Sequence, residues 1–70
     1  MNTNDLNAEI ARCGLTKPQL AKKIGISKKC LYSRLKGETS FKQEEIQKIA
    51  SILNLDEGKI MNIFFAELVS

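Results

Sequence analysis

The chain has 70 residues, of which 43% are hydrophobic and 27% charged, and its net charge at neutral pH is +3. This length suits a single domain, residues 1–70, and the low content of proline and glycine argues against a disordered chain. The polar start of the chain is unlike a signal peptide, and no apolar run is long enough to cross a bilayer. We therefore expect a cytoplasmic protein that has no membrane partner.

Positive charge is concentrated in one part of the sequence. Residues 12–37 hold eight lysines and arginines and no acid, whereas residues 38–70 hold three lysines and six acids. A basic cluster of this kind is typical of a surface that binds phosphate groups. A solvated lysine face is the alternative explanation, but it does not account for the position of the cluster within two specific helices.

The first helix is expected to begin after a cap at Thr3 or Asn4 and to run to about Cys13. Leu6 and Ile10 lie four residues apart and therefore share one face of this helix. We expect that face to be buried and the helix to cover the back of the two helices that follow.

The basic part of the chain is predicted to form two short helices that are joined by a tight turn. Thr16 and Gln19 have the spacing of a capping box at the start of the first helix. Gly25 permits the positive φ that ends a helix in a sharp turn, and Ser27 caps the next helix. This arrangement, at about residues 17–36, is that of a DNA-binding helix-turn-helix, and also of an αα-hairpin within a helical bundle. The charge favours DNA binding.

A helical wheel of the second of these helices places Leu31 and Leu35 on its inner face. Side chains on the outer face and in the first turn are candidates for contacts with DNA bases. These candidates are Lys28, Lys29, Ser33 and Tyr32. The candidates for phosphate contacts are Lys17, Lys22, Lys23, Lys36 and Lys42. Arg34 lies to the side of the outer face, and we expect it to pair with an acid or a phosphate.

The fourth helix is predicted from about residue 42 or 43 to Asn54, after a loop in which Phe41 is expected to fill the edge of the core. Its apolar stripe consists of Ile46, Ile49, Ala50 and Leu53. The polar residues expected on its outer face are Glu44, Glu45, Gln47, Lys48 and Ser51.

The last helix is predicted at about residues 57–68, with Asp56 as its cap. Ile60 and Phe64 account for one buried face, but this helix is apolar on nearly all sides and needs more than one partner. The residues expected at a protein interface, most simply a homodimer contact, are Met61, Ile63, Phe65, Leu68 and Val69. The alternative is that this segment folds back over the first helix.

The sequence offers little for catalysis or metal binding. It contains no histidine, no CxxC pair and no glycine-rich phosphate loop, and its two cysteines are Cys13 and Cys30. We expect reduced thiols that pack as small hydrophobic residues, and no metal or cofactor. An enzyme is the least expected class, although Lys29 and a helix N-terminus favour the thiolate form of Cys30.

The segment TKPQLAKKIGISKK resembles the helix-turn-helix of the lambda-repressor-like family, which includes phage repressors and Cro proteins. The residues that carry the resemblance are Leu20, Ala21, Ile24, Gly25, Ser27 and Leu31. The fourth predicted helix and the following NLDEG are similar to the same family. The resemblance implies an all-α, compact five-helix DNA-binding domain with the helix-turn-helix at helices 2 and 3. Arg34 occupies a position at which family members usually have a second core residue.

The resemblance implies that the chain is a sequence-specific transcriptional regulator of phage or prophage type, with double-stranded operator DNA as its ligand. It also implies base recognition in the major groove by Lys28, Lys29 and Ser33. Small phage chains of this type also act as antirepressors, which bind a phage repressor and block its DNA-binding surface. The basic segment fits either role, because a protein partner can offer acids where DNA offers phosphates.

Overall fold

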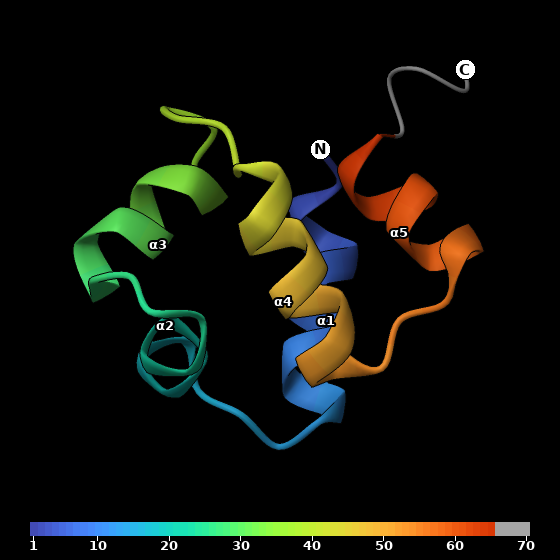
Figure 1. The fold of residues 1–70 in the computed structure, drawn as a ribbon, viewed down its shortest axis with the longest axis horizontal. Coiled ribbons are helices and arrows are strands. Elements are labelled where there is room, and N and C mark those ends of the chain that lie inside the picture. Colours follow the sequence, from blue (N-terminus) through green and yellow to red (C-terminus); the bar gives the residue numbers. More distant parts are fainter. Residues whose placement is uncertain (66–70) are drawn as a thin grey trace.

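Five helices and no strand make up residues 1–65, the part of the chain that the computed structural model describes (Figure 1). In chain order they are α1 (Thr3–Arg12), α2 (Lys17–Ile24), α3 (Lys28–Leu35), α4 (Gln43–Leu53) and α5 (Glu57–Phe64). The expected all-α architecture is confirmed. None of these five helices combines the length and the apolar character that crossing a bilayer requires.

Three of the helices begin, as predicted, at a residue whose side chain caps the helix by bonding to a backbone N–H three positions further on. The Thr16 side chain accepts a hydrogen bond from the backbone N–H of Gln19, and the Gln19 side chain accepts one from the N–H of Thr16, at 3.3 and 2.9 Å. Ser27 and Asp56 each accept the N–H three residues further on, at 3.1 and 2.8 Å. These bonds satisfy N–H groups that have no partner within the helix.

The cap of α1 differs from the prediction. Asn2, rather than Thr3 or Asn4, accepts the backbone N–H of Asp5, at 3.2 Å. The hydroxyl of Thr3 is used elsewhere, because it donates to the backbone carbonyl of Leu35 at 3.1 Å. The prediction was wrong at this helix because Thr3 has a partner at the far end of α3.

A sharp turn joins α2 to α3. Gly25 has a φ of 81°, the left-handed conformation that a side chain would strain, and it ends α2 as predicted. Only three residues therefore separate the end of α2 from the start of α3, and the two helices pack against each other.

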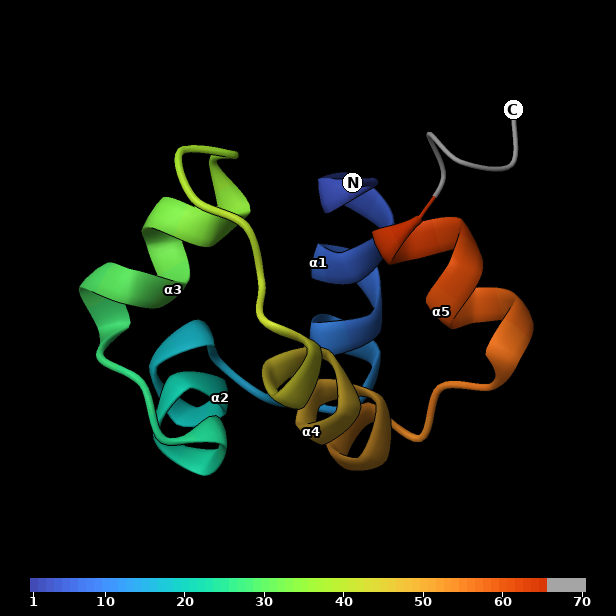
Figure 2. The ribbon, with the colours of Figure 1, turned by 45° about the horizontal axis from the view of Figure 1, so that its top comes forward.

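The core is assembled from all five helices and from Leu55, one of the three residues between α4 and α5. Its buried apolar side chains are Leu6, Ile10, Leu20, Ala21, Ile24, Leu31, Leu35, Ile49, Leu53, Leu55 and Ile63. Helix α2 packs against α3 and α4, and α5 packs against α1. Figures 1 and 2 both show α3 and α5 on opposite sides of the molecule, with α1 and α4 between them. This arrangement leaves the side of α3 that faces away from α1 and α4 open to solvent.

The buried stripe of α4 is rotated from the predicted one. Glu45 lies in it with Ile49 and Leu53, spaced by four residues, and is only 7% exposed. Ile46, which the sequence predicts in the stripe, is half-buried. The prediction that Glu45 points outward is wrong because its carboxylate pairs with the guanidinium of Arg34 at 2.7 Å.

Helix α5 folds back over α1, which is the alternative considered for the C-terminal segment. The backbone N–H of Asn2 donates to the carbonyl of Ile63 at 2.6 Å, and the Asn62 amide donates to the Asp5 carboxylate at 2.8 Å. These contacts join residues more than fifty positions apart in the sequence. The expected extension of this helix to about residue 68 reaches beyond the described residues.

The residues expected at a protein interface do not share one environment. Ile63 is 1% exposed and belongs to the core, so its assignment to an interface is wrong. Met61 is 41% exposed and Phe65 is half-buried. Leu68 and Val69 lie outside the described residues.

Candidate nucleic-acid interface

Helix α3 is held on the core by one side and exposed along the other. Leu31 and Leu35 are buried, and the carbonyl of Leu35 is tied to Thr3. Residues 28–30 are exposed, and Figure 2 shows α3 at the edge of the molecule. The side of α3 that faces solvent is therefore the side that the helical wheel predicts.

A shallow concavity runs along the exposed side of α3. The residues that line it are Lys28, Lys29, Tyr32, Ser33, Lys36 and Glu38. All four candidates for base contacts thus lie together, and Lys36 from the phosphate set lies with them. Sequence reasoning does not single out Glu38, although it is the first acid after the acid-free stretch. Its carboxylate places a negative charge at the C-terminal end of a cationic surface.

The other candidates for phosphate contacts lie outside this concavity. Lys22 and Lys23 are exposed on α2, and Lys42 is exposed where α4 begins. Lys17, at the start of α2, is half-buried. The cationic side chains are therefore spread over α2, α3 and the start of α4 rather than gathered at a single point.

Both arginines of the basic stretch have partners within the protein. Arg12 pairs with Glu9 at 2.9 Å and donates to the carbonyl of Leu53 at 3.0 Å. Arg34 pairs with Glu45, so the expected choice between an acid and a phosphate is decided in favour of an acid within the protein. Within residues 1–65, no ion pair joins an acid to any of the six lysines of the basic stretch. Their charge is available to a ligand.

The two cysteines are free and differ in environment. Cys13 is half-buried, with its sulfur 3.7 Å from the carbonyl oxygen of Leu53, whereas Cys30 is exposed rather than packed as expected. Hydrogen bonds with Ser27 and Arg34 lower the pKa of the Cys30 thiol. Residues 1–65 contain no cluster of three histidine, cysteine or acidic side chains that could hold a metal ion.

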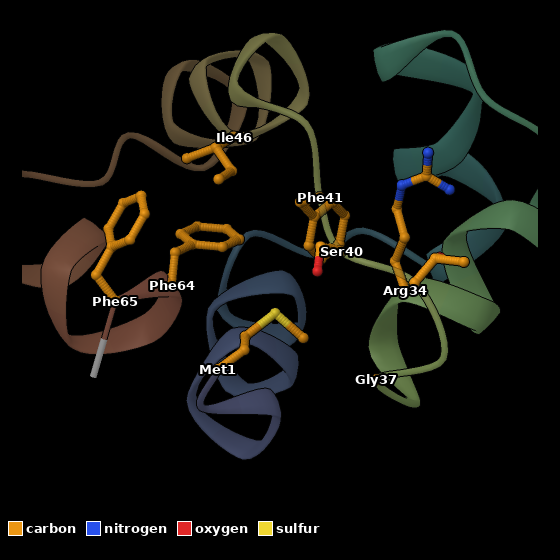
Figure 3. Close-up of a pocket in the computed structure, with 9 residues that line it drawn as sticks. Met1, Arg34, Gly37, Ser40, Phe41, Ile46, Phe64 and Phe65 are labelled. Atoms are coloured by element: carbon orange, nitrogen blue, oxygen red, sulfur yellow. The ribbon is translucent and has the colours of Figure 1, made fainter. Parts of the chain in front are cut away.

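An apolar groove lies on the other side of the molecule, between α4 and α5. The residues that line it are Phe41, Gln43, Ile46, Gln47, Ala50, Ile60 and Phe65. A neighbouring cavity of about 360 Å³ shares three of them and extends toward the end of α3 (Figure 3). Phe41 fills the edge of the core as predicted, and its ring meets that of Phe64 edge to face with centroids 5.6 Å apart.

Comparisons with known proteins give a family but no function. Searches among curated proteins and among solved structures returned no match. A family model named DUF739, with the description "Protein of unknown function", matches residues 3–67. Because this match covers nearly all of the sequence, the chain belongs to the DUF739 family.

Proposed function

We propose that this protein is a sequence-specific transcriptional regulator that inserts α3 into the major groove of double-stranded DNA. The observation that carries the proposal is the exposed side of α3, where Lys28, Lys29 and Ser33 line one concavity with Tyr32 and Lys36. The major groove is about 12 Å wide and accepts an α-helix. Lysine ammonium groups suit the acceptors of guanine, and a serine hydroxyl suits several bases.

The distribution of charge supports the same proposal. Acids of the protein neutralise both arginines of the basic stretch, whereas the six lysines have no acid partner among residues 1–65. Lysines on α2 and at the start of α4 flank the concavity in sequence and serve as phosphate contacts in this proposal. Exposed ammonium groups gain most from a polyanion, because binding releases the counterions of DNA.

The resemblance to lambda-repressor-like proteins supports a phage or prophage regulator. In this proposal helix α2, the turn at Gly25 and helix α3 play the part of the helix-turn-helix of that family, in which the second helix contacts bases. In this proposal α2 crosses the DNA backbone.

A duplex titration tests the proposal. Fluorescence anisotropy is measured with labelled DNA from the intergenic region next to the gene and with a scrambled duplex, at several salt concentrations. Contacts with about six phosphates give a slope of log K against log salt near −5. The intergenic duplex is expected to bind more tightly than the scrambled one. Equal affinity for the two duplexes at every salt concentration would contradict sequence-specific binding.

In this proposal the protein binds DNA as a homodimer through the face formed by α4 and α5. The apolar groove on this face and the 41% exposure of Met61 support such a contact. Two copies related by a two-fold axis match half-sites about 34 Å apart. Sedimentation at micromolar concentration is expected to show a dimer that Met61→Glu dissociates. A strict monomer would contradict the dimer and leave the DNA proposal standing.

An antirepressor is the competing function, and the duplex titration separates the two. The phage-type repressor encoded next to the gene is added to the same duplex, with and without this protein. A complex formed by this protein alone supports direct regulation. Loss of the repressor's complex, with no binding by this protein itself, would replace the proposal with that of an antirepressor.

A further inference from the structure

A buried ion pair connects α3 to α4. The Nε of Arg34 lies 2.7 Å from Oε1 of Glu45, and the two side chains are 11% and 10% exposed. The same carboxylate oxygen accepts the backbone N–H of Lys42 at 2.9 Å, and Nη1 of Arg34 donates to the carbonyl of Cys30 at 3.4 Å. One carboxylate thus joins the start of α4 to Arg34 in the last turn of α3.

This pair differs from the other ion pairs of the described residues. In the Arg12–Glu9 and Lys59–Glu9 pairs, the cation is 51% and 48% exposed. Burying an ion pair costs desolvation energy, so apolar side chains of similar size often give equal or greater stability. A guanidinium–carboxylate contact fixes the relative position of the two helices that carry it, because the guanidinium is planar and its donors point in set directions.

The position of this contact bears on how α3 presents its outer side chains. Arg34 follows Ser33 directly, and its guanidinium reaches back to the first turn of α3 at Cys30. In Figure 3 the Arg34 side chain extends from α3 at the edge of the cavity that Phe41 and Phe64 also line. The apolar contacts of Leu31 and Leu35 hold the helix on the core, but apolar packing is not directional. The Arg34–Glu45 pair is directional, as is the hydrogen bond from Thr3 to the carbonyl of Leu35 at the end of the helix.

A small rotation of α3 has a large effect at its surface. Side-chain tips lie about 5–6 Å from a helix axis, so a rotation of 20° displaces them by about 2 Å. Specific contacts tolerate an error of only about 0.5 Å. Contacts with phosphates by long lysine side chains adapt to such a displacement, whereas contacts with base edges do not.

We propose that Glu45 is a positioning residue, which acts through Arg34 to fix the rotation of α3 and thereby sets the discrimination between DNA sequences. This inference rests on the proposed function. It assigns no DNA contact to Arg34 or Glu45. Both residues act from within the protein, and loss of their contact leaves the attraction to phosphates intact.

The test compares Glu45→Gln with Glu44→Gln. A glutamine at position 45 keeps an oxygen for Lys42 and Arg34 but removes the charge that holds the guanidinium. Glu44 is the exposed neighbour on the same helix, so the control variant makes the same change in net charge without touching the pair. The measured quantity is the ratio of affinities for the intergenic and the scrambled duplex.

We expect this ratio to fall at least tenfold in Glu45→Gln and to stay within twofold of wild type in Glu44→Gln. Affinity for the scrambled duplex is expected to be equal in the two variants. A merely destabilised protein would lose affinity for both duplexes alike, because only the folded fraction would change, and the ratio would not move. An unchanged ratio in Glu45→Gln overturns the proposal.

Amide hydrogen exchange of the free protein provides a second test of the positioning role, one that needs no DNA. In Glu45→Gln the amides of α3 are expected to exchange at least tenfold faster relative to those of α1, and in Glu44→Gln they are not. If the wild-type protein binds neither duplex, the proposed function fails. The exchange measurement still decides whether the Arg34–Glu45 pair positions α3. Equal relative exchange in the two variants overturns the positioning role.

Arg34→Lys serves as the second variant. Lysine keeps the charge of Arg34 but offers a single ammonium group in place of the planar guanidinium. We expect a loss of discrimination with an unchanged salt slope. If Arg34 contacted a phosphate, lysine would replace it and the discrimination would be kept, which would contradict the proposal.

Discussion

Helices α3 and α5 have the same length, begin with similar side-chain caps and lie on opposite sides of the molecule, yet they use their polar residues differently. On α5, Lys59 and Asn62 are bonded to the acids Glu9 and Asp5 of α1. On α3, the exposed lysines have no acid partner within residues 1–65. The comparison shows which charges serve the fold and which remain for a ligand.

The largest effect is expected in the core beneath α3, where Leu31 is fully buried. Leu31→Ala removes packed methyl groups and leaves a cavity, so it should lower the free energy of unfolding by about 2–5 kcal/mol. Met61→Ala on α5 should change it by less than about 0.5 kcal/mol in dilute protein, because Met61 is 41% exposed. Urea unfolding measures both values. Similar losses in the two variants would contradict the described burial.

The next effect concerns sequence discrimination. Lys29→Ala and Ser33→Ala should each cost about 1–3 kcal/mol at one operator position, because each removes a contact with a base edge. Lys48→Ala, a change of an exposed lysine on α4, should have no such effect. Affinities for a set of singly substituted duplexes measure this. A loss that is uniform over all sequences would show that the assigned roles are wrong.

A smaller and sequence-independent effect is expected for Lys36. Its replacement by alanine removes one phosphate contact, so affinity for every duplex should fall and the salt slope should decrease in magnitude by about 0.9. Titrations at several salt concentrations give the slope. An unchanged slope, with Lys48→Ala as the matched control, would place Lys36 outside the interface.

The smallest effect is a pH dependence at the contact between α5 and α1. The hydrogen bond from Arg12 lowers the pKa of Glu9 below its ordinary value of 4.5; burial opposes this shift, and Lys59 adds to it. The contacts of ionised Glu9 with Arg12 and Lys59 therefore stabilise the folded state above pH 4.5. This contribution is lost as the pH falls through the lowered pKa of Glu9. Amides of α5 should exchange faster, relative to those of α3, below that range.

Glu9→Gln is the control for this pH dependence, because it removes the titrating group and should abolish the difference between α5 and α3. If wild type and Glu9→Gln respond to acid identically, the Glu9 contacts do not hold α5 on α1.

Features that depend on nearby residues could be predicted from the sequence. The cap bonds of Thr16, Ser27 and Asp56 span three positions, and the turn at Gly25 depends on a single residue. The outer side of α3 could also be predicted, because the position of Leu31 fixes the helical wheel.

Features that depend on distant partners could not be predicted in the same way. Glu45 is buried because Arg34, on another helix, neutralises it, and a helical wheel assigns an acid to the solvent side. Ile63 is buried because α5 folds onto α1 through contacts with the opposite end of the chain. One local feature of the sequence does indicate that Glu45 is buried: it lies four residues before Ile49, on the line of the buried stripe.

DNA binding through α3 is tested most directly by mapping backbone amide chemical shifts while a duplex of the intergenic DNA is added to the protein. We expect the largest shifts along the exposed side of α3, at Lys28, Lys29, Ser33 and Lys36, and little change in the amides of α5. Shifts that are largest on α4 and α5, or that are absent from α3 at saturating DNA, would contradict it.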